Sequence, residues 1–126
     1  MNVLLDACAL LAPASGSLPN TAVRCLAAAP EAWVSVVSPW ELAIKARAGK
    51  LSLPLPPAVW CDRLCRRHNL RLLPLSLEAV CDAASLAPLH RDPFDRVLVA
   101  IAARHHLTIL TSDTIVPRYP GIRTLW

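Results

Sequence analysis

Short apolar runs alternate with amphipathic segments along the chain, and this alternation predicts a series of strands and helices. Strands are predicted at residues 1–5, 32–37, 70–73, 107–110 and 122–126. Helices are predicted at residues 10–29, with a break from 13 to 19, and at 39–48, 58–68, 76–86 and 93–106. The proline-rich stretch at 51–57 cannot form a central strand. The order of elements predicts a mostly parallel sheet with helices packed against it.

Composition agrees with this prediction. The chain has 126 residues, of which 55% are hydrophobic, so it can bury a core without disulfides. Its apolar residues are mostly Ala, Leu and Val, which suits helices packed on a sheet better than a thin β-sandwich. We therefore expect an α/β fold, a single domain over residues 1–126, with a central sheet of four to five strands flanked by helices.

Acidic residues follow two predicted strands and open two predicted helices. Asp6 follows the first strand, and Asp113 follows the strand at 107–110. Glu41 and the pair Asp92 and Asp95 lie at helix starts. Ligands of open α/β sheets bind beyond the carboxyl ends of the strands, so we expect these acids to share one site.

Each acid also has a purely structural interpretation. Ser38 and Glu41 fit a capping box, in which the glutamate bonds back to the helix start, and Asp92 fits a cap of the next helix. Asp113 alone is typical of a turn. Asp6 is harder to explain in this way, because an unpaired carboxylate between two apolar runs is costly to bury. Capping and ligand binding therefore both stay open for the two helix starts.

Taken together, the acids predict a metal site. Carboxylates gathered this closely repel one another, so at least one pKa would be strongly raised unless a divalent cation compensates. A ligand set made of oxygen atoms suits Mg²⁺ or Mn²⁺. Such an ion can activate water and hold the oxygens of a phosphodiester during an in-line displacement.

Four stretches of the chain carry a more specific pattern around these acids. They are residues 4–11, 34–45, 88–96 and 110–113, together with the ending at 119–126. In these stretches the chain resembles the PIN-domain family, and within it the VapC-type toxin ribonucleases of bacterial toxin–antitoxin pairs. The segment His90-Arg91-Asp92-Pro93-Phe94-Asp95-Arg96 is similar to the signature of that subgroup.

The resemblance implies a Mg²⁺- or Mn²⁺-dependent endoribonuclease, a hydrolase that cleaves RNA phosphodiester bonds with a metal-activated water. It implies that the catalytic, metal-binding acids are Asp6, Glu41, Asp95 and Asp113, with Asp92 as an auxiliary ligand or helix cap. It also implies a homodimer held inactive by a cognate VapB-like antitoxin, whose C-terminal segment lies across the acidic groove.

One position departs from the family pattern. Thr or Ser, often followed by His, usually comes after the first aspartate, whereas this chain has Ala7 and Cys8. Loss of a hydroxyl that bonds a ligand carboxylate would weaken metal binding. Two alternatives therefore stay open: a catalytically weakened module that binds RNA or antitoxin, and a metal-dependent phosphatase with Asp6 as nucleophile. The phosphatase is less favoured, because Cys8 stands where such enzymes generally need a second acid.

Basic residues favour a polyanionic partner. The net charge is +4, and eleven of the thirteen basic residues are arginine, whose planar fork binds phosphate well. Trp40 could stack a nucleobase, although packing in the core or in a dimer is the favoured interpretation. The residues that we expect to contact RNA are Arg91 and Arg96, which flank the acids, and Lys45 and Arg47 on the helix of Glu41.

Cysteine usage and hydropathy favour a cytoplasmic protein. Five cysteines without a Cys-x-x-Cys pair argue against a disulfide framework. Residues 1–17 lack a basic start and contain Asp6, so we expect no secretion signal. No apolar run is long enough to cross a membrane. Cys61, Cys65 and His68 share one helix face, but no fourth ligand has the spacing of a zinc site.

Overall fold

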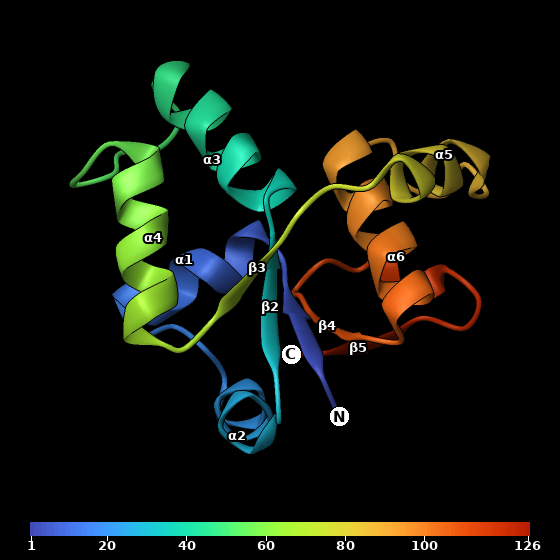
Figure 1. Cartoon of the computed structure of the whole chain (residues 1–126), viewed down its shortest axis with the longest axis horizontal. Helices are drawn as coiled ribbons and strands as arrows, with labels where there is room; N and C mark the ends of the chain where they lie inside the picture. The colour runs from blue at the N-terminus through green and yellow to red at the C-terminus, as the bar shows by residue number, and fades with distance from the viewer.

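A parallel β-sheet forms the centre of the molecule (Figure 1). The computed structural model describes the backbone of residues 1–126 and all side chains except those of residues 13–15. In this backbone, five strands lie in the order β3-β2-β1-β4-β5, and every neighbouring pair is parallel. The strands are β1 (Val3–Leu5), β2 (Ala32–Ser35), β3 (Arg71–Leu73), β4 (Thr108–Leu110) and β5 (Arg123–Leu125).

Helices cover both faces of the sheet. Figure 1 shows α1, α3 and α4 on one side and α5 and α6 on the other, with α2 near one end. The helices are α1 (Ala7–Ser15), α2 (Asn20–Ala28), α3 (Val37–Arg47), α4 (Pro57–Arg67), α5 (Leu77–Ser85) and α6 (Pro93–His105). A short 3-10 helix, η1 (Val116–Arg118), precedes β5. The prediction of a parallel α/β sheet flanked by helices is confirmed.

Side chains of the central strands alternate between two hydrophobic cores. Val3 and Leu5 of β1 pack in the core beneath α1, α3 and α4, whereas Leu4 packs in the core beneath α5 and α6. In β4, Leu110 belongs to the first core and Ile109 to the second. All five side chains are completely buried. Each such burial contributes about 1.5–3 kcal/mol, so the strands that carry the site are firmly anchored.

Two helix boundaries differ from the prediction. Helix α1 begins at Ala7 rather than Leu10, because Asp6 caps it, and it continues to Ser15 before Gly16 turns the chain with φ +69°. The predicted break at residues 13–19 therefore begins later than expected, after Ser15, and it ends before α2 as predicted. Helix α3 begins at Val37 rather than after Ser38, because the Ser35 hydroxyl accepts a hydrogen bond from the backbone N–H of Val37 at 3.2 Å.

Other caps agree with the sequence. The Ser76 hydroxyl accepts a hydrogen bond from the Ala79 N–H at 3.1 Å and caps α5. Gly49 follows the end of α3 with φ +75°, a conformation that favours glycine. These caps place the start of α5 and the end of α3 where the local sequence predicts them.

The strand order determines where a ligand can bind. The chain moves from β1 outwards through β2 to β3, and then returns to the other side of β1 for β4 and β5. The direction of winding therefore reverses between β1 and β4. A crevice opens at such a point beyond the carboxyl ends of the strands, which is where Asp6 and Asp113 follow β1 and β4.

The cysteines are divided between the core and the surface. All five are free thiols, and Cys61 and Cys65 are buried against Trp60 and Leu64 in the first core. Burial, with a contribution from Cys65, raises the pKa of Cys61 to about 12, so this thiol stays protonated at neutral pH. Among the described residues, no helix has the length and apolar character needed to span a bilayer.

Candidate metal and active site

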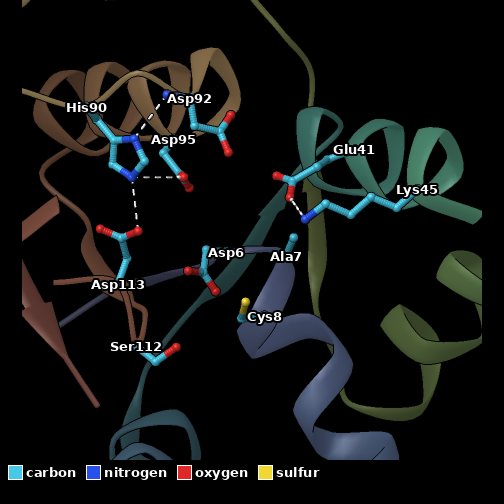
Figure 2. A pocket seen from close by; sticks show the side chains of 10 residues that line it. All are labelled: Asp6, Ala7, Cys8, Glu41, Lys45, His90, Asp92, Asp95, Ser112 and Asp113. Atoms are coloured by element: carbon cyan, nitrogen blue, oxygen red, sulfur yellow. Dashed lines mark hydrogen bonds and ion pairs between the residues drawn. The ribbon is translucent and has the colours of Figure 1, made fainter. Parts of the chain in front are cut away.

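A pocket of about 260 Å³ opens at the carboxyl edge of the sheet (Figure 2). All five acids predicted from the sequence line it, although they come from four separate parts of the chain. The complete lining is Asp6, Ala7, Cys8, Glu41, Lys45, His90, Asp92, Asp95, Ser112 and Asp113.

Asp6 combines a structural and an electrostatic role. Its side chain is almost completely buried, and Oδ1 accepts a hydrogen bond from the Ala9 N–H at 2.7 Å, which caps α1. Burial raises the pKa of Asp6, hydrogen bonds from Thr111 and Ala9 oppose this, and the charges of Glu41 and Asp113 raise it further. The carboxylate is thus held rigidly in a place where its negative charge is poorly compensated.

Glu41 faces the pocket and does not cap a helix. Helix α3 has Val36 at its N-cap without a side-chain hydrogen bond, so the capping-box interpretation of Ser38 and Glu41 is wrong. The Glu41 side chain is 8% exposed, and its Oε2 lies 2.6 Å from Nζ of Lys45, one turn further along α3. This hydrogen bond is the main reason why the pKa of Lys45 is raised. Figure 2 shows both side chains directed from α3 towards the pocket.

Asp92 and Asp95 come from the start of α6. Asp92 caps the helix, because its Oδ1 accepts a hydrogen bond from the Phe94 N–H at 2.9 Å. Burial raises the pKa of Asp95 to about 7, with a further increase from the charge of Asp92 and an opposing effect of His90. Capping and a place in the acidic pocket therefore coexist in this pair.

Asp113 is held by hydrogen bonds on both carboxylate oxygens. Its Oδ1 accepts from the backbone N–H groups of Ile115 at 2.7 Å and Val116 at 2.9 Å, and its Oδ2 lies 2.9 Å from Nε2 of His90. Burial acts to raise the pKa of Asp113, but the hydrogen bonds from His90, Val116 and Ile115 lower it below the ordinary value. Asp113 therefore remains ionised in the pocket.

His90 is a pocket residue to which the sequence analysis gave no role. Its Nε2 lies 3.2 Å from Oδ2 of Asp95 as well as 2.9 Å from Oδ2 of Asp113. Burial lowers the pKa of His90, but the hydrogen bond to Asp113 and the charges of Asp95 and Asp113 raise it above the ordinary value. Its place two residues before Asp92, at the start of the acidic segment, was the sequence signal that could have identified it.

The donor atoms suit a hard divalent cation. Two groups of three donors have ligand atoms within 4.8 Å of one another, namely Glu41 with Asp92 and Asp95, and His90 with Asp95 and Asp113. Carboxylate oxygens are the ligands that Mg²⁺ and Mn²⁺ prefer. Burial and the charge of Asp92 raise the pKa of Asp95, so the basic side chains near it, among the described residues, do not fully compensate its negative charge. The residues present therefore fit the predicted Mg²⁺ or Mn²⁺.

The predicted RNA contacts fall in different places. Lys45 lines the pocket, whereas Arg47 and Arg91 are exposed outside its lining. Arg96 is placed differently from the prediction: its guanidinium donates to the carbonyl oxygens of Ala83 at 2.8 Å and Leu86 at 3.1 Å. It therefore anchors the end of α5 instead of facing the acids, because α5 packs against α6.

Comparison with known proteins identifies the family. The chain matches the PIN domain family over residues 3–122, so it belongs to the PIN domain family. A search of curated proteins gives no match. The observed single PIN domain agrees with the expected fold.

Several solved structures share this fold at low sequence identity. VapBC2 from Rickettsia felis, bound to a DNA fragment from its promoter, has a TM-score of 0.73 at 14% identity, over 99% of this chain and 98% of the other. DNA-bound VapBC from Salmonella typhimurium has a TM-score of 0.72 at 18% identity, over 99% and 97%. FitAcB from Neisseria gonorrhoeae has a TM-score of 0.68 at 20% identity, over 100% and 97%.

Proposed function

We propose that this PIN domain is the toxin of a type II toxin–antitoxin system, a metal-dependent endoribonuclease that hydrolyses RNA phosphodiester bonds. The observation that carries the proposal is the convergence of five carboxylates in one pocket of a PIN domain. The similarity of the fold to proteins from VapBC and FitAB complexes supports the assignment to a toxin–antitoxin pair.

The positions of the acids assign them different tasks. Glu41, Asp92, Asp95 and Asp113 would hold one or two Mg²⁺ or Mn²⁺ ions, since they supply all the carboxylates of the two close groups. A bound divalent cation would supply Lewis acidity for water activation and would neutralise phosphate charge. Asp6, also predicted as a ligand, lies in neither close group, and its raised pKa suits it to accept a proton from water.

Basic residues at the rim would bind the RNA backbone. Lys45 has a side chain that is 47% exposed, so its ammonium can contact a phosphate while it remains bonded to Glu41. Arg91 and Arg47 are exposed near the pocket-forming helices α6 and α3 and would extend this contact along the strand.

A buried residue outside the pocket lining, Thr111, supplies the hydroxyl that Ala7 lacks. Ala7 offers no hydroxyl to a ligand carboxylate, but the Thr111 side chain forms a hydrogen bond with Asp6. A hydroxyl donor is therefore present beside the first aspartate, which supports a site competent for metal binding.

A cleavage assay tests the proposal directly. The antitoxin-free protein would be incubated with RNA in EDTA, Mg²⁺ or Mn²⁺. We expect cleavage only with metal, and we expect Glu41→Gln to reduce the rate by about two orders of magnitude or more. Glu78→Gln is the matched control, because Glu78 is an exposed glutamate in the first turn of α5. Cleavage in EDTA, or equal rates for both variants, would refute the proposal.

The weakened module is the second candidate, favoured by Ala7 and by the exposed Cys8 in the pocket. It predicts RNA or antitoxin binding without cleavage, and Mn²⁺ affinity measured by calorimetry separates it from the nuclease. The phosphatase is not proposed, because Cys8 stands where such enzymes generally need a second acid.

We propose a homodimer in which α3 supplies the contact, in a protein that works in the cytoplasm with a VapB-like antitoxin. Three apolar side chains recur every four residues at the start and along one side of α3. They are Val36, Trp40 and Ile44, which are 37%, 58% and 46% exposed. Trp40 is therefore not a core residue. Light scattering should show a dimer that Ile44→Asp dissociates, whereas Val59→Asp on the exposed side of α4 should leave it intact.

A further inference from the structure

We propose that His90 is a positioning residue of this site, which holds the carboxylates of Asp95 and Asp113 together through one N–H group and does not bind the ion itself. The proposal rests on the metal-dependent function given above and deepens it. The relevant geometry is the bridge from one imidazole nitrogen to two acids, visible as dashed lines in Figure 2.

The hydrogen bonds of His90 select one tautomer of its ring. Nδ1 accepts a hydrogen bond from the backbone N–H of Asp92 at 3.1 Å, so this nitrogen carries no hydrogen. A neutral ring must then carry its hydrogen on Nε2, which faces Asp113 and Asp95. The lone pair that a metal would need at Nε2 is therefore occupied by hydrogen, and coordination would require loss of the bond from Asp92.

Hydrogen bonds to Tyr119 and Arg96 hold the segment that carries His90 in place. The backbone N–H of His90 donates to Oη of Tyr119 at 3.0 Å, and Tyr119 is 3% exposed. Nη1 of Arg96 lies 3.5 Å from the same Oη and donates to the Ala87 carbonyl at 3.1 Å. Tyr119 and Arg96 thus connect the loop before α6 to the body of the protein, which leaves the imidazole little freedom to move.

This support has a direct effect on the two acids. Asp113 already accepts two backbone N–H groups on Oδ1, so the bond from His90 to Oδ2 fixes the plane of its carboxylate. The same N–H lies 3.2 Å from Asp95, and it screens part of the repulsion between the two charges. The acids are thereby held at a separation that a cation can use without reorganisation, which is how outer groups improve metal affinity.

Mn²⁺ affinity measured by calorimetry on the full chain tests the proposal. We expect His90→Ala to bind Mn²⁺ about 10- to 100-fold more weakly than the unmodified protein. His90→Gln should recover most of the affinity, because the glutamine amide can place an N–H close to the position of Nε2. His105→Asn is the matched control, since His105 is exposed in the last turn of α6, and it should leave the affinity unchanged.

Two spectroscopic measurements separate positioning from ligation. Long-range ¹H–¹⁵N spectra of the metal-free protein should show the Nε2–H tautomer for His90. Pulsed EPR of the Mn²⁺ form should show no directly coordinated nitrogen that His90→Ala removes. A Nδ1–H tautomer, a coordinated nitrogen lost in His90→Ala, or unchanged affinity in a folded His90→Ala would each overturn the proposal.

The outcomes also distinguish this inference from the proposed function. Absence of Mn²⁺ binding by the unmodified protein would contradict the metal-dependent function, and the inference with it. If the unmodified protein binds Mn²⁺ and both His90 variants bind it with the same affinity as the unmodified protein, only the role of His90 is contradicted. If His90→Ala does not fold, His90→Gln decides the question. A Mn²⁺ affinity of His90→Gln close to that of His105→Asn would support the proposal. A Mn²⁺ affinity below a tenth of that of His105→Asn would overturn it.

Discussion

Neutralising Asp95 should stabilise the metal-free protein, because this carboxylate lies where its charge is least tolerated. Burial and the neighbouring acids raise its pKa from 3.8 to about 7. Each pKa unit corresponds to about 1.4 kcal/mol, so the ionised form carries a cost of at most about 4 kcal/mol. Asp95→Asn keeps an oxygen for His90 and removes the charge, and we expect a gain of about 1–2 kcal/mol after relaxation and amide burial.

The pH dependence gives this prediction a definite sign. Between about pH 4 and about pH 7 the folded state holds a proton on Asp95 that the unfolded chain has lost, so ionisation costs stability as the pH rises. The raised pKa of His90 acts in the same direction, because the folded state binds this proton more tightly than the unfolded chain and loses stability as the imidazole is deprotonated. The stability difference between Asp95→Asn and the unmodified protein should therefore grow from about pH 4 to about pH 7 and then level off.

Thermal melting in EDTA measures the effect. A gain of 1–2 kcal/mol corresponds to a melting temperature higher by roughly 4–8 °C for a domain of this size. Asp62→Asn is the matched control, because Asp62 is 56% exposed and paired with Arg66, and it should shift stability by less than about 0.5 kcal/mol. In Mn²⁺ the order should reverse, since only the unmodified protein gains binding energy. A less stable Asp95→Asn in EDTA would refute the reasoning.

Three further changes follow from the site. Lys45→Met leaves Glu41 without its cation, so calorimetry should show Mn²⁺ binding a few-fold tighter while RNA binding, measured by fluorescence anisotropy, weakens. Arg96→Met should lower the free energy of unfolding by about 1–2 kcal/mol in urea, because it removes the hydrogen bonds to the Ala83 and Leu86 carbonyls, and only Ala83 keeps another donor among the bonds described. Arg91→Met should change only RNA affinity and its salt dependence. Asp6→Ala should cost about 1 kcal/mol relative to Asp6→Asn, which retains the cap; equal melting temperatures for the two would contradict this.

The strand ends could be predicted from the sequence because their signals are local. A buried strand such as β1 appears as a short apolar run, and an acid directly after it must lie at the carboxyl edge of a parallel sheet. Asp6 and Asp113 were placed by this argument alone. Their convergence with Glu41 then follows from the strand order, which brings β1 between β2 and β4.

Features that depend on contacts between distant segments could not be predicted in this way. The start of α3 was placed too late, because the Ser35 hydroxyl and the pairing of Val36 N–H with the Leu73 carbonyl override the local capping signal. The roles of His90 and Arg96 depend on a loop that carries no periodic pattern. Arg96 lies in α6, and only the packing of α5 against that helix brings its guanidinium to the end of α5. The path of the loop places the His90 imidazole between two acids.

Glu41 differs from Asp6 in what the backbone requires of it. Asp6 closes the first turn of a helix, whereas the Glu41 carboxylate bonds only to the lysine one turn away among the contacts described. A glutamine at position 41 should therefore give an inert protein with an undisturbed surface. Such a protein would be the form best suited to capturing an uncut nucleic acid for crystallography, because it would still bind the strand but would no longer cleave it.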